Sequence, residues 1–383
     1  MLKQNSEYFI ALTGAKKNVG DFLITKRALK LLKSVAPQYE YVVRPHWESL
    51  DEINFINNSK GIIILGGPGF QQNMYPRVYK LSKNLNDIKV PIWTLGTGWK
   101  GTPGDKTTEK LYEFTKNTKD LLDKLEVNSN GMSCRDYQTK RTLNNNGYKN
   151  VVMTGCPVWY DIDSINKEFK SPYEIKKIVF TPAQNEMFSE QSIDVMKYLK
   201  NKFAESKIVV SFHRGIGEID DFTPESDAKN TQLLADKALE MGFEIADVSY
   251  DANKLDFYDD CDLHIGYRVH AHIYFLSKRL PSILLHEDGR GNGVTEALKS
   301  PGINGYKINK FYSGIFSLFN NNSKVLSIYR RLAYKIDKNI ITKLDSKIDE
   351  LENIKYAEFN QVAQVIDNQY EVMKEYIKGI TTS

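Results

Sequence analysis

The sequence predicts an α/β protein with two Rossmann-like, doubly wound domains. Short apolar, β-branched runs alternate with amphipathic stretches through most of the 383 residues, and this order is typical of parallel sheets with helices on both faces. The alternation forms two series, separated by polar residues and a proline at 163–172. A chain of this length also exceeds what one hydrophobic core usually serves, which favours two domains.

The first series predicts an N-terminal domain over residues 1–165. Helical periodicity is clearest at 22–32 and 106–124. The candidate strands, each a short apolar run, are 8–12, 41–43, 61–65, 92–95, 131–134 and 151–153.

The second series predicts another such domain over residues 172–300. Amphipathic helices are expected at 191–203 and 228–241. Ligands of doubly wound sheets bind beyond the carboxyl ends of the strands, so we expect functional residues in the turns that follow the strands of both domains. The candidate strands are 178–181, 207–212, 243–247, 263–265 and 282–285.

The last part of the chain has a different composition. Residues 301–343 hold eight Lys or Arg against one acid, Asp337, and interleave them with seven aromatic residues. Such a segment is often a solvated face, but it can also lie on an anionic membrane surface, and we favour the membrane contact. The final segment, 344–383, contains an apolar stripe over 344–378 that predicts one long amphipathic helix.

Composition narrows the class of protein further. The formal net charge of +4 is too weak to indicate nucleic-acid binding. The three cysteines lie far apart, form neither a disulfide framework nor a zinc motif, and favour a reducing cytoplasm without a metal site. We find no signal peptide and no apolar run of membrane-spanning length. We therefore expect a cytoplasmic protein, peripheral to the inner face of the plasma membrane, whose oligomeric state stays open.

Three glycine-rich turns follow predicted strands in the first domain. Glycine lets the backbone approach a ligand closely, so three such turns at one sheet edge would form the floor of a cleft. No Gly-Lys-Ser/Thr follows any of them, and none matches the spaced dinucleotide fingerprint. Asp21 would cap a helix that begins at Phe22. The turns read Asn18-x-Gly20-Asp21, Gly66-Gly67-x-Gly69 and Gly96-x-Gly98.

Arginines and histidines follow other predicted strands. The segment 264–272 holds three of the six histidines together with one arginine. Guanidinium groups bind carboxylate and phosphate in a forked geometry, and imidazole moves protons near neutral pH. These residue types at strand ends predict a site for a small anion that also receives a proton. The candidate arginines are Arg135, Arg214, Arg268 and Arg290.

Taken in order, these motifs resemble those of the polysaccharide pyruvyl transferase family. The resemblance covers roughly residues 10–300 and adds Ser133-x-Arg135-Asp136 and Gly266-x-Arg268-x-His270 to the glycine turns, with Pro281 in the next loop. The chain departs from the family pattern at two places. It has Gly155-Cys156-Pro157 where many members have Gly-Asp-Pro, and it has Arg290 where a lysine is common.

The resemblance implies two domains facing a cleft in a GT-B-like fold, the first on the acceptor side and the second on the donor side. It implies transfer of the pyruvyl group of phosphoenolpyruvate, a donor substrate and no cofactor, to a sugar of a cell-surface polymer or its lipid-linked precursor. It also implies that Arg268 and His270 contact phosphoenolpyruvate. The two can converge only if one of them precedes the regular helix, because helical positions two apart do not share a face.

We expect His270 to act as general acid, Arg268 to stabilise developing charge, and Asp21 or Asp136 to accept the sugar proton. The expected donor and substrate contacts are Arg135, Arg214, Arg290, Asn18, Gly67, Gly98, His272 and Glu296.

Two other classes of function stay open at this point. A GT-B-type glycosyltransferase in capsule or surface-polysaccharide synthesis would use Arg268 and Arg290 for a nucleotide diphosphate, and Glu287 or Glu296 for the ribose. A non-catalytic protein that binds polysaccharide or membrane would depend on residues 301–343 rather than on the predicted site.

Overall fold

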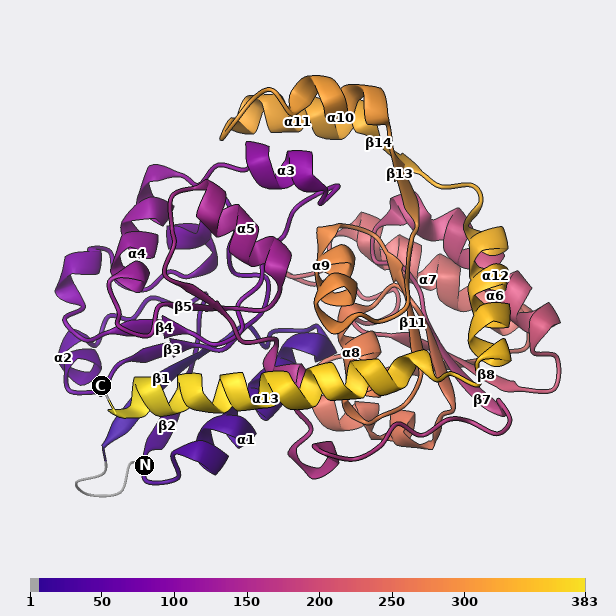
Figure 1. Ribbon diagram of the computed structural model, residues 1–383, viewed down its shortest axis with the longest axis horizontal. Helices are drawn as coiled ribbons and strands as arrows, with labels where there is room; N and C mark the ends of the chain where they lie inside the picture. Colours follow the sequence, from indigo (N-terminus) through magenta and orange to yellow (C-terminus); the bar gives the residue numbers. More distant parts are fainter. Residues whose placement is uncertain (1–6, 383) are drawn as a thin grey trace.

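Two parallel sheets, one in each half of the chain, form the frame of the protein (Figure 1). The computed structural model describes residues 7–382. The first sheet has the strand order β2-β1-β3-β4, and every side chain of β1 is buried. Its strands are β1 (Tyr8–Thr13), β2 (Glu40–Pro45), β3 (Ile62–Ile64) and β4 (Ile92–Thr94).

A smaller parallel pair, β5 (Met132–Cys134) and β6 (Val151–Met153), continues the first domain. It joins the main sheet through a bridge between Thr97 and Cys134. All six strands predicted for this half are therefore present, although they do not form one continuous ladder. The helices of this domain are α1 (Val19–Val35), α2 (Ile53–Asn57), α3 (Lys106–Leu111), α4 (Lys116–Glu126) and α5 (Tyr137–Asn145).

The second domain is built on a six-stranded parallel sheet with the order β12-β11-β10-β7-β8-β9. The five strands predicted for this half are present, and β12 extends the sheet at the β11 edge. Its strands are β7 (Lys177–Thr181), β8 (Lys207–Phe212), β9 (Glu244–Asp247), β10 (Leu263–Gly266), β11 (Ser282–His286) and β12 (Gly302–Asn304). Its helices are α6 (Ser189–Lys202), α7 (Glu225–Glu240), α8 (Val269–Ser277) and α9 (Gly289–Leu298).

The predicted helix over 106–124 is wrong, because the chain breaks it into α3 and α4. The backbone is extended at Tyr112 and Thr115, which flank the break. Tyr112 and Phe114 are both buried in the core, where Tyr112 packs edge-on against Trp99 with ring centroids 5.3 Å apart. Burial of two aromatic rings outweighs the intrinsic helix preference of the segment.

The single helix predicted over 344–378 is also wrong. The chain forms α12 (Ile340–Asn353) and α13 (Glu358–Thr382) instead. Between them Lys355 and Tyr356 have left-handed φ values of 49° and 58°. The turn buries Tyr356 and brings Phe359 onto Phe169, with stacked rings 5.0 Å apart. Helix α13 then runs back across both domains (Figure 1).

Between the second sheet and α12, residues 305–337 leave the second domain and pack on the first. The antiparallel strands β13 (Tyr306–Ile308) and β14 (Tyr334–Ile336) carry α10 (Lys310–Phe316) and α11 (Ser323–Ala333), which lie over α3 in Figure 1. Neither β13 nor β14 is among the predicted strands, since both are only three residues long and each has a lysine at its centre. No helix within residues 7–382 has the length and hydrophobicity needed to cross a bilayer.

Candidate functional site

A cavity of about 290 Å³ lies where the carboxyl ends of the two sheets meet. It is lined from the first domain by the turns after β1 and β3, and from the second by the turns after β8, β10 and β11. This is the position expected for ligands of doubly wound sheets. The predicted site residues that line it are Asn18, Asp21, Gly67, Arg135, Arg214, Arg268, His270 and Arg290.

Each arginine of the cavity is held on one side by a protein acceptor. Arg290 is paired with Asp288 at 2.8 Å, and Arg135 with Asp136 at 3.1 Å. Arg214 donates from Nη2 to the carbonyl of Phe222 at 2.9 Å. These contacts fix the orientation of the guanidinium groups before any ligand arrives.

Several donors that face the cavity have no protein acceptor. Nη2 of Arg135, Nε of Arg214 and Nε of Arg268 are buried and without a hydrogen-bond partner among the residues that the structure describes. Buried donors of this kind are costly unless a ligand or water satisfies them. Charged N–H groups prefer anionic acceptors, so the cavity is suited to bind an anion with several oxygen atoms.

Arg268 and His270 converge as the sequence requires. Arg268 is the N-cap of α8 and has extended backbone angles, whereas His270 lies in the first turn of the helix. The Arg268 guanidinium contacts Gln184, whose own backbone N–H donates to Glu287 at 2.9 Å. Burial lowers the pKa of Arg268, the Glu287 carboxylate opposes this shift, and with the charges of Arg214 and Arg290 the pKa comes to about 10.

His270 is the one histidine of the segment 264–272 that lines the cavity. Its Nε2 is buried without a partner in the described chain. Burial, together with the charges of the cavity arginines, lowers the pKa of His270 to about 3, so the ring is neutral at pH 7. A glycine at position 20 is required here, because a Cβ would lie 2.3 Å from Nδ1 of His270.

Asp21 lies opposite, in the first turn of α1. The expected capping role is wrong: the helix begins at Val19 with Asn18 as N-cap, and Asn18 donates from Nδ2 to the Asp21 carboxylate at 3.1 Å. Burial raises the pKa of Asp21 to about 6. The carboxylate is therefore mostly ionised at pH 7 and can accept a proton. Asp136, the other candidate base, caps α5 through Thr139 at 2.7 Å and does not line the cavity.

Three predicted site residues lie outside the cavity lining. His272 is fully buried, with Nδ1 2.7 Å from Oγ of Ser282 and Nε2 2.9 Å from Oγ of Ser300. These contacts account for its position without a contact to a ligand. Glu296 is paired on the surface with Arg141 at 2.7 Å. Gly98 acts indirectly, because a Cβ there would lie 2.5 Å from the Arg135 guanidinium.

The cavity also contains charged residues that sequence reasoning missed. Lys16, Lys17 and Lys100 line it, and all three follow strands of the first domain. The charge of Arg290, followed by burial, lowers the pKa of Lys100, as expected where positive groups are crowded. Their position after β1 and β4 was a usable signal, but lysine is so frequent in this chain that position alone did not distinguish them.

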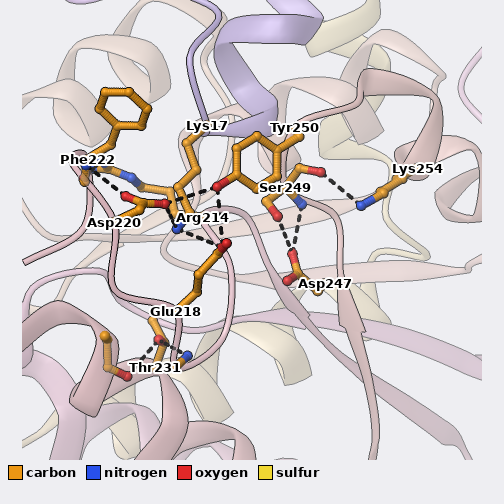
Figure 2. A network of polar contacts seen from close by, with 12 residues as sticks. Lys17, Arg214, Glu218, Asp220, Phe222, Thr231, Asp247, Ser249, Tyr250 and Lys254 are labelled. Carbon is orange, nitrogen blue, oxygen red and sulfur yellow. Dashed lines mark hydrogen bonds and ion pairs between the residues drawn. The ribbon is translucent and has the colours of Figure 1, made fainter. Parts of the chain in front are cut away.

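Lys17 links the two domains at the mouth of the cavity, in the network of Figure 2. Its side chain is 1% exposed, and Nζ lies 2.6 Å from Asp220 and 3.0 Å from Glu218. Tyr250 donates from its hydroxyl to Asp220 at 3.0 Å and from its backbone N–H to the Lys17 carbonyl at 2.9 Å. The loop 214–223, which carries Arg214, is therefore fastened to the first domain.

Comparison with known proteins agrees with this geometry. The sequence profile of the polysaccharide pyruvyl transferase family matches residues 18–289. Among curated proteins no sequence matches the chain significantly. The chain belongs to the polysaccharide pyruvyl transferase family, and it is a transferase.

One solved structure shows the same fold at low sequence identity, and a second is similar over most of its length. S. aureus MnaA, in a co-structure with UDP, is similar with a TM-score of 0.54 and 12% identity, over 95% of this chain and 94% of that one. Anabaena Alr3699/HepE, in complex with UDP and glucose, matches with a TM-score of 0.47 and 9% identity, over 98% and 96% of the two chains. The fold is GT-B-like, with two Rossmann-like domains around the cleft.

Asp21→Asn is expected to stabilise the protein at neutral pH. The folded-state pKa of about 6 lies above the ordinary value of 3.8, so the unfolded chain ionises first and stability falls as pH rises between these values. Asparagine removes this cost, which is at most about 3 kcal/mol for a shift of this size. Thermal unfolding at pH 4 and pH 7.5 should show a gain in Tm at pH 7.5 only. An equal effect at both pH values would contradict a raised pKa.

Lys17→Met is expected to release the loop 214–223. The substitution removes the cation that binds Asp220 and Glu218, and limited proteolysis should then cut this loop several times faster. Lys30→Met is the matched control, because Lys30 forms a similar pair with Asp163 on the exposed surface of α1. Equal cleavage rates in the two variants would show that Lys17 does not hold the loop.

Proposed function

We propose that the protein transfers the pyruvyl group of phosphoenolpyruvate to a sugar hydroxyl of a cell-surface polysaccharide or its lipid-linked precursor. The observation that carries this proposal is the set of buried nitrogen atoms on Arg135, Arg214, Arg268 and His270 that surround one small cavity and have no hydrogen-bond partner within residues 7–382. Membership of the family supports the reaction class.

Phosphoenolpyruvate matches the cavity in charge and size. It carries a carboxylate and a phosphate on a three-carbon frame, and arginine side chains bind both groups through forked hydrogen bonds. The volume of about 290 Å³ is at the lower end of the usual range for ligand pockets, roughly 300–1,000 Å³. A compact donor is favoured over a nucleotide sugar for this reason. Glu296, one of two candidates for a ribose contact, is also committed to Arg141.

The reaction needs one proton donor and one proton acceptor. A proton is added to the methylene carbon of the donor, and a sugar hydroxyl attacks the adjacent carbon while losing its own proton. Phosphate then leaves with the bonding electron pair of its C–O bond. A second hydroxyl of the same sugar can attack that carbon and close a ketal, and its proton passes to the departed phosphate, so the products are the pyruvylated sugar and inorganic phosphate.

We assign the proton donation to His270. Burial, and after it the charges of the surrounding arginines, hold its pKa at about 3 while no anion is bound. A bound donor with two or three negative charges offsets those cations and favours the protonated imidazole. Binding of phosphoenolpyruvate would thus favour the protonated form of His270. Arg268 and Arg290 would stabilise the negative charge on the leaving phosphate.

We assign the sugar proton to Asp21. Its pKa of about 6 makes it a stronger base than an ordinary aspartate, yet it stays largely ionised at pH 7. It lies on the first domain, whose cavity wall we assign to the acceptor, whereas Arg268 and His270 come from the second domain. The two domains would therefore contribute the base and the acid separately.

The acceptor determines where the protein works. A lipid-linked precursor is confined to a membrane, and its sugar head would have to reach the cleft from that surface. We propose that the protein acts in the cytoplasm, at the inner face of the plasma membrane, with a small anionic donor and a glycan acceptor as its partners.

His270→Gln tests the proposed reaction. Loss of the general acid should lower kcat about 10²–10⁴-fold, whereas the cations that bind phosphoenolpyruvate are unchanged and its dissociation constant should stay within a few-fold. Turnover would be measured as phosphate released from phosphoenolpyruvate in the presence of glycolipids from the source organism. Mass spectrometry of the glycan should show a gain of C₃H₂O₂.

His272→Gln is the matched control, because His272 lies two residues further along α8 and outside the cavity. It should reduce stability but retain turnover per folded molecule within a few-fold. Full turnover of the His270 variant would exclude the assigned acid. Phosphate release without pyruvyl transfer in the unaltered protein would exclude the proposed function.

A further inference from the structure

Helices α10 and α11 present large apolar side chains to solvent. Phe311 and Ile315 lie four residues apart on α10 and are 70 and 42% exposed, and Leu318 in the turn after this helix is 80% exposed. Phe319 beside them is 47% exposed, and Ile328 on α11 is 46% exposed. We call this surface, together with the basic residues around it, the α10–α11 face.

The opposite side of the two helices is fixed to the first domain. Leu326 and Tyr329 of α11 are buried. Thr107 on α3 hydrogen-bonds with Ser313 at 2.9 Å, and the backbone N–H of Asn322 donates to the Leu111 carbonyl at 2.8 Å. The exposed apolar side chains are therefore held outward by a supported element, as Figure 1 shows for α10 and α11 over α3.

The charges of the α10–α11 face have one sign. The single acid of the segment, Asp337, is fully buried and paired with Lys307 and Lys343. Lys324 and Arg331 lie at helical spacing on either side of Ile328. The basic side chains of residues 301–343 that form no ion pair with any described residue are Lys310, Lys324, Arg330, Arg331, Lys335 and Lys338.

We propose that the α10–α11 face binds the surface of an anionic phospholipid membrane. Apolar side chains among unpaired lysines and arginines combine the two contributions that hold interfacial helices on such surfaces. A second copy of the chain is disfavoured as partner, because it would present the same positive charge. A purely polyanionic partner would leave Leu318 and Phe311 without a role. The inference rests on the proposed function in one respect: a lipid-linked acceptor would be the reason for the protein to bind a membrane.

This face is connected to the candidate site by the strands that carry it. The hydroxyl of Tyr334, directly after α11, donates to the carbonyl of Glu287, which lines the cavity. Tyr306 on the partner strand donates to the Pro103 carbonyl of the first domain. A membrane contact at α10–α11 would thus hold the cleft at a fixed height above the lipid surface.

Vesicle co-sedimentation tests the proposal. The full chain should bind vesicles that contain phosphatidylglycerol and not vesicles of phosphatidylcholine alone, with binding reduced by salt. Lys324→Glu combined with Arg331→Glu should weaken binding about 25-fold or more, since each basic residue near the surface contributes about 5-fold. Leu318→Ser should weaken binding several-fold.

Two matched controls change the same residue types elsewhere. Lys33→Glu with Lys83→Glu alters the net charge equally at two exposed sites, and Val127→Ser removes an apolar side chain that is 82% exposed. Both should bind as the unaltered protein does. Equal loss in the controls, or no preference for anionic vesicles, would overturn the proposal. A dimer that dissociates in Leu318→Ser, without vesicle binding, would assign the face to a second copy instead.

Failure of this inference is separable from failure of the proposed function. The α10–α11 variants should retain pyruvyl transfer to acceptor dissolved in detergent, because none of the changed residues lines the cavity. Vesicle binding without transfer would overturn the reaction alone, and transfer without vesicle binding would overturn the membrane contact alone.

Discussion

The structure depends on holding several guanidinium groups close together without neutralising them. Asp288, Asp136 and the Phe222 carbonyl each bind one side of an arginine and leave other N–H groups directed to the cavity. Like charges at such distances repel, and this repulsion adds to burial, the larger cause, in lowering the pKa values of Arg268 and His270. A bound anion would relieve this repulsion, so the same feature that costs stability provides binding energy and, on our proposal, sets the proton on the acid.

The two-domain frame makes this arrangement possible. Neither sheet alone supplies the whole site, because Asp21 and Arg135 come from the first domain and Arg214, Arg268 and Arg290 from the second. Close approach across the cleft depends on Gly20, against which His270 packs. Three further elements connect the two domains. Lys17 connects them at the mouth of the cleft, helix α13 across one face, and the segment 305–337 at one edge.

The strands of both sheets were predictable from the sequence. Short apolar, β-branched runs bounded by glycine or charged turns favour strands over other secondary structure. Eight of the eleven predicted site residues line the cavity, since parallel strands place their following turns at one edge. The predictions from sequence were wrong where contacts between residues distant in the chain determine the local structure. The burial of Tyr112 and Phe114 divides a periodic segment into α3 and α4, and the buried contacts of His272 with two serines remove it from the site. Lys17 and Lys100 were not distinguishable, because their role depends on residues of the other domain or of distant loops.

The most direct test of the account is which ligand stabilises the folded protein. Thermal unfolding would be measured with phosphoenolpyruvate and, separately, with UDP, each at about 100 times its dissociation constant if it binds, a level that adds about 2.7 kcal/mol. We predict that phosphoenolpyruvate raises Tm, that Arg268→Lys largely removes this shift, and that UDP has little effect. Stabilisation by UDP and none by phosphoenolpyruvate would contradict a site built for a compact anionic donor.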